Sequence, residues 1–215
     1  MVRIFFYSSC INCNGEISDE ELIKYGKCKN CRDKETYFEK IKKEIESFEE
    51  FFYKILEVKP IKIQKNWISK FVKKKSFALI APTGCGKTTF GIVASLYFAI
   101  TGKRSYIILP TSILVKHVYE KIINIVSKKN LEVKVACYTT QLTEKEKKEN
   151  LEKISKGDFS ILITSDRFLK RIENISFDLI FIDDIDNFLK SSKNVEKVLS
   201  LNKGIIIVSG ATIKG

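Results

Sequence analysis

The stretch Ser76-Phe77-Ala78-Leu79-Ile80-Ala81-Pro82-Thr83-Gly84-Cys85-Gly86-Lys87-Thr88-Thr89 decides the fold of this chain. An apolar run ends in a short loop that contains glycine, and a helical pattern opens after it at Phe90. A strand, a phosphate-binding loop and a helix in this order are what a Walker A site requires. The backbone N–H groups of such a loop form, with the helix N-terminus, a concave set of donors that suits phosphate. A chance Gly-Lys-Thr turn would lack the flanking strand and helix.

The loop residues have separate expected tasks. Lys87 would reach the β- and γ-phosphates of a nucleotide, and the Thr88 hydroxyl would bind Mg²⁺. Gly84 and Gly86 leave out side chains where the backbone must touch phosphate or turn with positive φ. The sequence thus predicts ATP and Mg²⁺ as cofactors. The residues expected to bind the nucleotide here are Ala81, Pro82, Thr83, Gly84, Cys85, Gly86, Lys87, Thr88 and Thr89.

Length and composition set wider limits. The 215 residues are enough for one α/β domain with a small appendage, and the hydrophobic content of 44% supports a core. No apolar run of about 18 residues indicates a membrane span, and Cys10 and Cys13 follow the short apolar run Ile4–Tyr7, unlike a signal peptide. We therefore expect a cytoplasmic protein. The net charge of +12 fits either a polyanionic partner or a Lys-rich solvated surface. Two Gln, one Met and abundant Lys, Glu and Ile lean towards a thermophile.

Two Cys-x-x-Cys pairs lie near the N-terminus, separated by fourteen residues. Four thiolates on two tight turns match the tetrahedral coordination of a structural Zn²⁺. Two disulfides are the alternative, which a cytosolic chain disfavours. We therefore predict Zn²⁺ as a third cofactor, and its ligands are Cys10, Cys13, Cys28 and Cys31.

Apolar residues recur every three or four positions between residues 37 and 58, which predicts an amphipathic helix. Pro60 ends it, and a second short helix should follow. Gln64 lies about twenty residues before the phosphate loop, and its amide can donate and accept at once, as the N6/N7 edge of adenine requires. A lone Gln is ordinarily a surface residue, so this interpretation depends on the spacing.

Strand and helix patterns alternate after the loop. This order predicts a mainly parallel sheet with helices on both faces. Ligands of such sheets bind at the carboxyl ends of the strands, where Lys87, Asp183 and Ser209 should all lie. Thr143 and Glu146 form a capping box. The expected strands are 104–109, 133–138, 160–164, 178–183 and 204–209, and the expected helices include 112–126 and 143–154.

The second decisive stretch is Leu179-Ile180-Phe181-Ile182-Asp183-Asp184-Ile185-Asp186. An apolar strand delivers Asp183 to its tip, where a Walker B carboxylate holds Mg²⁺ through water. Asp184 would then orient or deprotonate the attacking water. Acidic residues also suit a helix N-cap, and Asp186 fits that simpler role.

Several stretches together resemble superfamily 2 helicases, and more specifically the N-terminal part of the reverse gyrase family. The paired Cys-x-x-Cys motifs ahead of the helicase core match that family too. The resemblance covers nearly the whole chain, and Asp-Asp-Ile-Asp in place of the usual Asp-Glu-Ala-Asp is its most specific element. The stretches are Phe48–Phe52, Gln64-x-x-Trp67, Ser76–Gly91, Pro110-Thr111, Asp183–Asp186 and Leu189–Asn194.

The resemblance implies a RecA-like P-loop NTPase domain preceded by a zinc-ribbon module. It also implies an ATP-dependent DNA topoisomerase, in which helicase domains fused to a type IA topoisomerase part positively supercoil DNA. That part, the second helicase domain and its arginine fingers lie outside this sequence. In this chain Gln64 would read adenine, and Asp183 and Asp184 would serve metal and water. Thr111 and the Thr164–Arg167 loop would contact the DNA backbone.

Two departures from the family pattern stand out. Ile55 and Leu56 occupy the place where an aromatic residue is expected to stack on adenine. The coupling motif Ser-Ala-Thr reads Gly210-Ala211-Thr212, so its hydroxyl is lost or supplied by Ser209.

The sequence predicts three parts: a four-cysteine zinc finger over residues 1–36, a linking helix over 37–58 and a first RecA-like domain over 59–215. The expected partners are DNA and the remaining helicase and topoisomerase part, without a membrane. Two other functions stay open: a fragment of a DEAD-type RNA or DNA helicase, and a nucleotide-gated DNA-binding module without hydrolysis.

Overall fold

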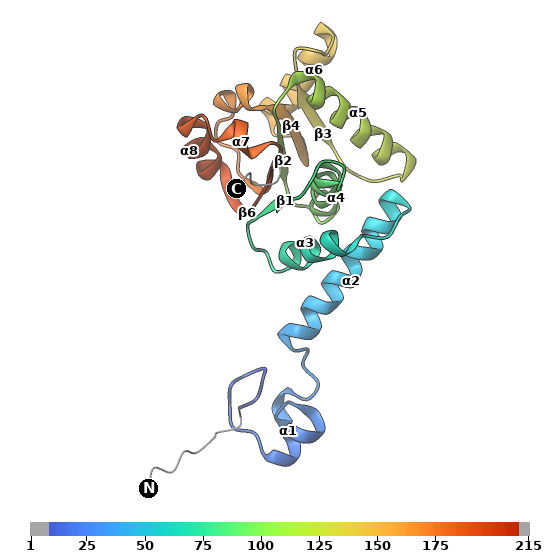
Figure 1. Ribbon diagram of the computed structural model, residues 1–215, viewed down its shortest axis with the longest axis vertical. Coiled ribbons are helices and arrows are strands. Elements are labelled where there is room, and N and C mark those ends of the chain that lie inside the picture. Colours follow the sequence, from blue (N-terminus) through green and yellow to red (C-terminus); the bar gives the residue numbers. More distant parts are fainter. Residues whose placement is uncertain (1–8, 211–215) are drawn as a thin grey trace. The chain divides into compact units, whose positions relative to one another are not determined.

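The computed structural model describes residues 9–210 (Figure 1). The chain forms two compact units, Met1–Ser47 and Phe48–Gly215. The border lies inside one long helix, α2 (Tyr37–Leu56), which covers most of the amphipathic stretch expected from the sequence. The division into residues 1–36, 37–58 and 59–215 stays a prediction.

The first unit is built from tight turns and two short helices. Helix α1 (Asp19–Tyr25) begins with a capping box between Ser18 and Glu21 and ends at Gly26, which has φ +63°. A single 3-10 turn, η1 (Lys29–Cys31), follows. The guanidinium of Arg32 lies 3.9 Å from the ring centre of Tyr25. With so little apolar surface to bury, this unit depends on its four clustered cysteines for a core.

The second unit is a six-stranded parallel sheet with the order β1-β6-β5-β2-β4-β3. Four of its strands are runs of β-branched and aromatic residues that are buried almost throughout, as in sheets covered on both faces. The strands are β1 (Phe77–Ile80), β2 (Ser105–Leu109), β3 (Val135–Tyr138), β4 (Ile161–Ser165), β5 (Phe177–Ile182) and β6 (Asn202–Gly210).

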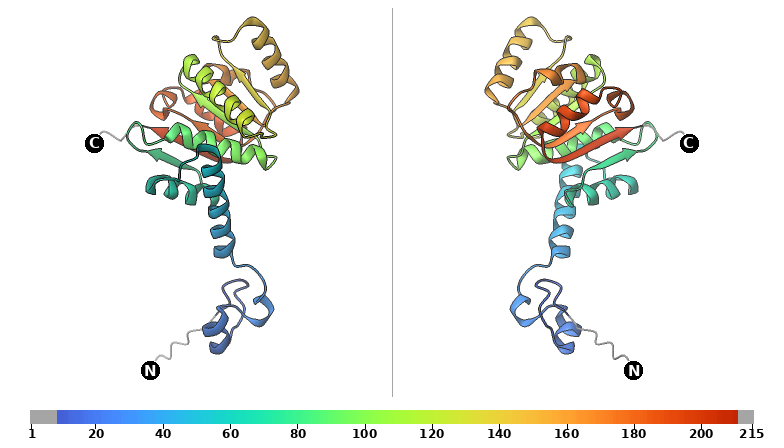
Figure 2. Two further views of the ribbon diagram at one scale, coloured as in Figure 1. Left: turned by 90° about the vertical axis from the view of Figure 1, so that its right-hand side faces the viewer. Right: turned by 90° about the vertical axis from the view of Figure 1, so that its left-hand side faces the viewer.

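Helices cover both faces of this sheet (Figure 2). Right-handed crossovers place the helices that lead from β1 to β2 and from β2 to β3 on one face, and the later connections on the other. The first face carries α4 (Lys87–Ile100) and α5 (Ser112–Lys128). The second carries α6 (Glu144–Lys156), η2 (Asp166–Arg171), α7 (Ile185–Phe188) and α8 (Ser192–Leu201).

An aromatic cluster joins the end of α2 and helix α3 (Lys62–Val72) to α4. The Phe48 ring centre lies 4.9 Å from that of Phe71 and 6.0 Å from that of Phe90, and Trp67 meets Phe90 edge-on at 5.5 Å. Such pairs add to the burial of their area. The cluster therefore holds α3, which carries Gln64, against the helix that follows the phosphate loop.

Helix α4 also approaches the sheet closely at one point. A Cβ added to Gly91 would lie 2.5 Å from Cε1 of Phe181 on β5, so only glycine fits there. This contact fixes the first turns of α4 over the strand that carries Asp183.

The α/β fold expected from the sequence is confirmed, with every strand in the expected order. The Thr143–Glu146 capping box is present. Asp186 is not the N-cap of α7, because Asp184 occupies that position. No helix among residues 9–210 is long and apolar enough to cross a membrane.

Candidate functional site

The phosphate loop lies between β1 and α4, as the sequence predicts. Gly84 and Gly86 have φ of +87° and +79°, the left-handed region that side chains disfavour. Gly86 is the N-cap of α4, and no side chain caps this helix end. The first N–H groups of α4 therefore remain open to an anionic ligand, which the helix dipole also favours.

Lys87 folds back over the loop. Its ammonium donates to the carbonyl oxygens of Ala81, at 2.5 Å, and Pro82, at 3.0 Å. These bonds hold a positive charge at the mouth of the loop.

Thr88, Asp183 and Ser209 meet at the carboxyl edge of the sheet. The Thr88 hydroxyl donates to Oδ2 of Asp183 at 2.7 Å, and the Ser209 hydroxyl donates to Oδ1. Strands β5 and β6 are neighbours in register, which brings Asp183 and Ser209 side by side. One carboxylate thus links the phosphate loop, β5 and the last strand.

Asp184 has φ +60°, an unusual conformation for a residue with a side chain, and begins α7. Its N–H donates to Oγ of Ser209 at 3.4 Å. Backbone strain of this kind persists where the surrounding structure imposes it, often at functional sites. The turn directs the chain away from β5 directly after Asp183.

Asp183 and Asp184 share a small cavity with Asp166, which the sequence placed only in the expected DNA-contacting segment, and with Asn187, which sequence reasoning missed. The volume of this cavity is about 10 Å³, close to what one water molecule needs. Asp166 directly follows β4, which lies next to β2 in the sheet. Its position at the carboxyl end of an expected strand was the signal in the sequence that could have placed it at this site.

Gln64 is buried against the phosphate loop. Its Oε1 accepts from the N–H of Ile61 at 3.0 Å, and its Nε2 donates to the carbonyl oxygen of Cys85 at 3.2 Å. These partners fix which end of the amide is oxygen. An amide has two N–H groups and two lone pairs on its oxygen, so Gln64 keeps one donor and one acceptor for a ligand.

The two segments expected to contact DNA differ in exposure. Thr111 is exposed and caps α5, accepting from the N–H of Leu114 at 3.2 Å. Thr164 is fully buried in β4, where its hydroxyl bonds the Tyr106 hydroxyl at 2.7 Å. The expectation for Thr164 is therefore wrong, because the residue packs between neighbouring elements of the core. Arg167 of the same segment is exposed.

The four N-terminal cysteines gather in the first unit. Their Sγ atoms all lie within 4.8 Å of one another, and those of Cys13 and Cys28 are 3.8 Å apart. A tetrahedral ion with Zn–S bonds of about 2.3 Å needs sulfur atoms roughly 3.8 Å apart. Cys10, Cys13, Cys28 and Cys31 form no disulfide in the structure, and the spacing of their sulfur atoms suits a tetrahedral metal ion.

The thiols of this cluster differ in acidity. The Cys28 N–H donates to Cys10 Sγ at 3.3 Å, which lowers the pKa of the Cys10 thiol to about 6. Burial raises the pKa of Cys31 to about 12, and the neighbouring thiols add to this effect. A divalent cation would relieve the cost of bringing four thiolates together.

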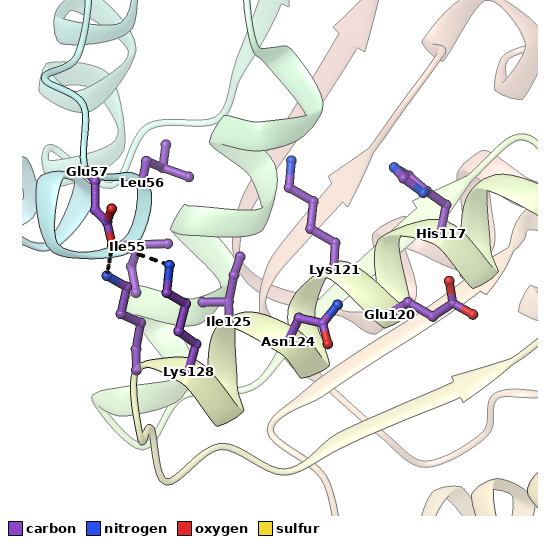
Figure 3. Close-up of a pocket in the computed structure, with 10 residues that line it drawn as sticks. Ile55, Leu56, Glu57, His117, Glu120, Lys121, Asn124, Ile125 and Lys128 are labelled. Carbon is purple, nitrogen blue, oxygen red and sulfur yellow. Dashed lines mark hydrogen bonds and ion pairs between the residues drawn. The ribbon is translucent and has the colours of Figure 1, made fainter.

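A cleft of about 500 Å³ in the second unit lies between the end of α2 and α5 (Figure 3). It is bordered by Ile55 and Leu56, and by Lys121 and Lys128 of α5. Lys121 donates to the Thr89 hydroxyl at 3.5 Å, which places the cleft beside the start of α4. Thr88 and Ser209, the residues that contact Asp183, are not among the described residues that line this cleft.

Residues 61–214 match the model of the DEAD/DEAH box helicase family, and the chain belongs to that family. It also resembles the N-terminal helicase part of reverse gyrases. It is 41% identical to a reverse gyrase of Methanocaldococcus jannaschii over 94% of this chain and 14% of that protein. It is 43% identical to reverse gyrase 1 of Aquifex aeolicus over 94% of this chain and 19% of that protein. The chain thus spans less than a fifth of the length of these relatives.

Solved structures agree on the fold. A hypothetical ATP-dependent RNA helicase from Sulfolobus tokodaii matches with a TM-score of 0.59 and 21% identity, over 78% of this chain and 51% of that chain. A DEAD box protein from Methanococcus jannaschii matches with a TM-score of 0.56 and 21% identity, over 81% and 48%. At this identity the likeness concerns the fold alone.

Proposed function

We propose that the chain is the ATP-binding N-terminal helicase portion of a reverse gyrase, an ATP-dependent DNA topoisomerase. The observation that carries the ATP-binding part is the hydrogen bond between Thr88 and Asp183, because it joins a phosphate loop to a strand-end carboxylate. The reverse gyrase part is supported by reverse gyrase relatives whose match covers 94% of this chain.

Each site residue then has a task. Lys87 binds the β- and γ-phosphates, and the open N–H groups that follow Pro82, in residues 83–89, bind the remaining phosphate oxygens. Thr88 and Asp183 would hold Mg²⁺, which when bound neutralises charge on the phosphates. Asp184 borders a cavity that fits one water molecule, so it is the group to orient or deprotonate that water. Gln64 uses its spare donor and acceptor on adenine.

Ser209 supplies the hydroxyl that the coupling motif lacks at Gly210. Its bond to Asp183 connects the end of β6 to the Walker B carboxylate, and the following residues, Ala211 and Thr212, lie outside the described part. A change at the nucleotide thereby acts on the strand that leads out of this domain.

Zn²⁺ on the four cysteines has a structural task in this proposal, because all four coordination positions are filled by protein. DNA is the expected partner of the exposed Thr111 and Arg167. The remaining helicase and type IA topoisomerase part is the other partner, in the same chain or in a separate subunit, and the cytoplasm is the proposed location.

A chimera tests the proposal. This chain would replace the corresponding N-terminal part of the Methanocaldococcus jannaschii reverse gyrase, and the product would be assayed on relaxed plasmid. We expect ATP-dependent positive supercoiling, lost in the Lys87→Ala chimera. Duplex or RNA unwinding without any change in plasmid topology would instead favour a DEAD-type helicase of another kind.

A further inference from the structure

Lysines gather at the amino edge of the sheet, opposite the edge that carries Asp183. Three of them, Lys74, Lys103 and Lys203, line one cavity of about 210 Å³, together with Asp178. They come from the turn before β1, the turn before β2 and the start of β6, so the sheet brings them together. Three more lysines of the α3–β1 segment are exposed beside them. We call this set the amino-edge patch: Lys70, Lys73, Lys74, Lys75, Lys103 and Lys203.

The carboxylate in this cavity does not neutralise the patch. Oδ2 of Asp178 accepts from the N–H of Arg104 at 2.8 Å, which is a bond of the fold itself. The other oxygen lies 3.6 Å from the ammonium of Lys203. One carboxylate, with one of its two oxygens already hydrogen-bonded to the backbone, therefore faces three ammonium groups. The local charge stays positive.

The ammonium groups of the cavity are open to solvent, because Lys74 and Lys203 are exposed and Lys103 is half-buried. A Cβ on Gly204 would lie 2.2 Å from the carbonyl oxygen of Asp178, so only glycine allows β6 to approach β5 this closely beside the cavity. Lys74 has φ +54°, in the position where a helix end usually has glycine or asparagine.

The composition of the patch distinguishes between partners. The cores of protein interfaces are depleted of lysine, whereas clustered lysines on one face are typical of nucleic-acid binding. Lysine binds phosphate as a point charge, and contacts to phosphate carry no sequence information. We propose that the amino-edge patch binds the phosphate backbone of duplex DNA without sequence preference. This inference rests on DNA as the partner in the proposed function.

The amino-edge patch lies away from the other groups proposed to contact DNA. Thr111 and Arg167, the proposed DNA contacts, follow β2 and β4 at the carboxyl edge, whereas the patch lies at the amino edge. The five residues of β2 separate the edges by about 17 Å at about 3.3 Å per residue. The patch therefore adds phosphate contacts that are separate from those of Thr111 and Arg167.

The test measures binding of a labelled 20-base-pair duplex to the 215-residue chain at several salt concentrations. The patch variant carries Lys74→Gln, Lys103→Gln and Lys203→Gln. The control loses the same charge on α6 through Lys145→Gln, Lys147→Gln and Lys148→Gln, where three glutamates surround the lysines. We expect the slope of log K against log salt to fall by about 3 in the patch variant, about 1 per phosphate contact, and little in the control.

A further variant with a single substitution tests whether a loss of DNA affinity could instead result from unfolding. Lys74→Gly removes one charge and relieves the left-handed backbone, so it should raise the melting temperature while it lowers affinity for the duplex. If the wild-type chain binds DNA and the patch and control variants behave alike, the patch proposal fails and the proposed function stands. If the wild-type chain binds no DNA, both fail. Loss of affinity for a poly-glutamate peptide with DNA binding intact would assign the patch to an acidic protein and overturn the proposal.

Discussion

The Thr88 hydroxyl donates a hydrogen bond of 2.7 Å to Oδ2 of Asp183, although 95 positions separate the two residues. The other oxygen of Asp183 accepts from Ser209. A ligand that binds at this carboxylate therefore exchanges contacts with both the phosphate loop and the last strand.

Asp183→Asn separates the metal role of this carboxylate from its structural role. An amide still accepts from one hydroxyl and donates to the other, so we expect a small change in melting temperature. Without the charge, ATP affinity in Mg²⁺ should fall about 10–100-fold, while affinity in EDTA stays the same. Nucleotide titrations in both buffers measure this. Asp178→Asn, at the opposite end of β5, is the control and should leave the Mg²⁺ dependence unchanged.

Gln64→Ala should reduce both the stability of the loop and the preference for adenine. The change leaves the N–H of Ile61 and the carbonyl of Cys85 without their partner, at a cost of about 1–3 kcal/mol. Affinity for ATP should fall further than affinity for GTP, so that their ratio approaches one. Gln141→Ala, at an exposed glutamine, serves as the control. An unchanged ATP/GTP ratio would leave Gln64 with a structural role alone.

The isolated chain should bind ATP and hydrolyse it very slowly. An arginine finger on the departing γ-phosphate contributes about 10³–10⁵ in rate, and in the family it belongs to a second domain outside this sequence. Lys87→Ala should abolish binding, whereas Asp184→Ala should spare binding and lower only the residual turnover. Steady-state ATPase and nucleotide affinity, with and without DNA, are the measurements. Fast turnover by the 215-residue chain would contradict this account.

The chain should carry about one Zn²⁺, because its first unit has too little apolar core to fold without such a link. Metal analysis after purification without chelators measures the stoichiometry, and Co²⁺ substitution should give the spectrum of four thiolate ligands. Cys13→Ser should lower the metal content, whereas Cys137→Ala, in the second unit, should not. Two disulfides and no metal would refute the prediction.

Gly91→Ala should destabilise the second unit, although alanine favours helices by about 1 kcal/mol. The new Cβ would lie 2.5 Å from the Phe181 ring, an overpacking that typically costs about 1–3 kcal/mol. Phe181→Leu in the same chain should recover part of the loss. Ser95→Ala on the same helix should have the opposite sign, because the Ser95 hydroxyl is buried without a partner among the described residues. Urea unfolding of the wild-type chain and the three variants gives the comparison.

The sequence was sufficient for the order of strands and helices, because buried parallel strands and amphipathic helices have distinct periods. It also placed Lys87, Asp183 and Ser209 at one edge of the sheet, since all three follow from the carboxyl-edge rule. The four cysteines were predictable from spacing alone.

Other features depend on contacts that no local pattern encodes. Thr164 was expected at the end of a strand and at the start of a loop that contacts DNA, yet strand β4 extends past it and its hydroxyl pairs with Tyr106 of the neighbouring strand. Asp166 reaches the same cavity as Asp183 only because β4 and β5 flank β2. Lys74, Lys103 and Lys203 are far apart in sequence, so their shared cavity appears only once the sheet is assembled.

The strand order also has a consequence during synthesis on the ribosome. Among residues 9–210, strand β1, which leads into the phosphate loop, pairs only with β6, and β6 is made after the other five strands. Until residues 202–210 emerge, β1 has an unpaired edge and Asp183 lacks Ser209. A nascent chain therefore cannot complete its nucleotide site early, and a product stopped before residue 202 would expose strand edges that invite aggregation.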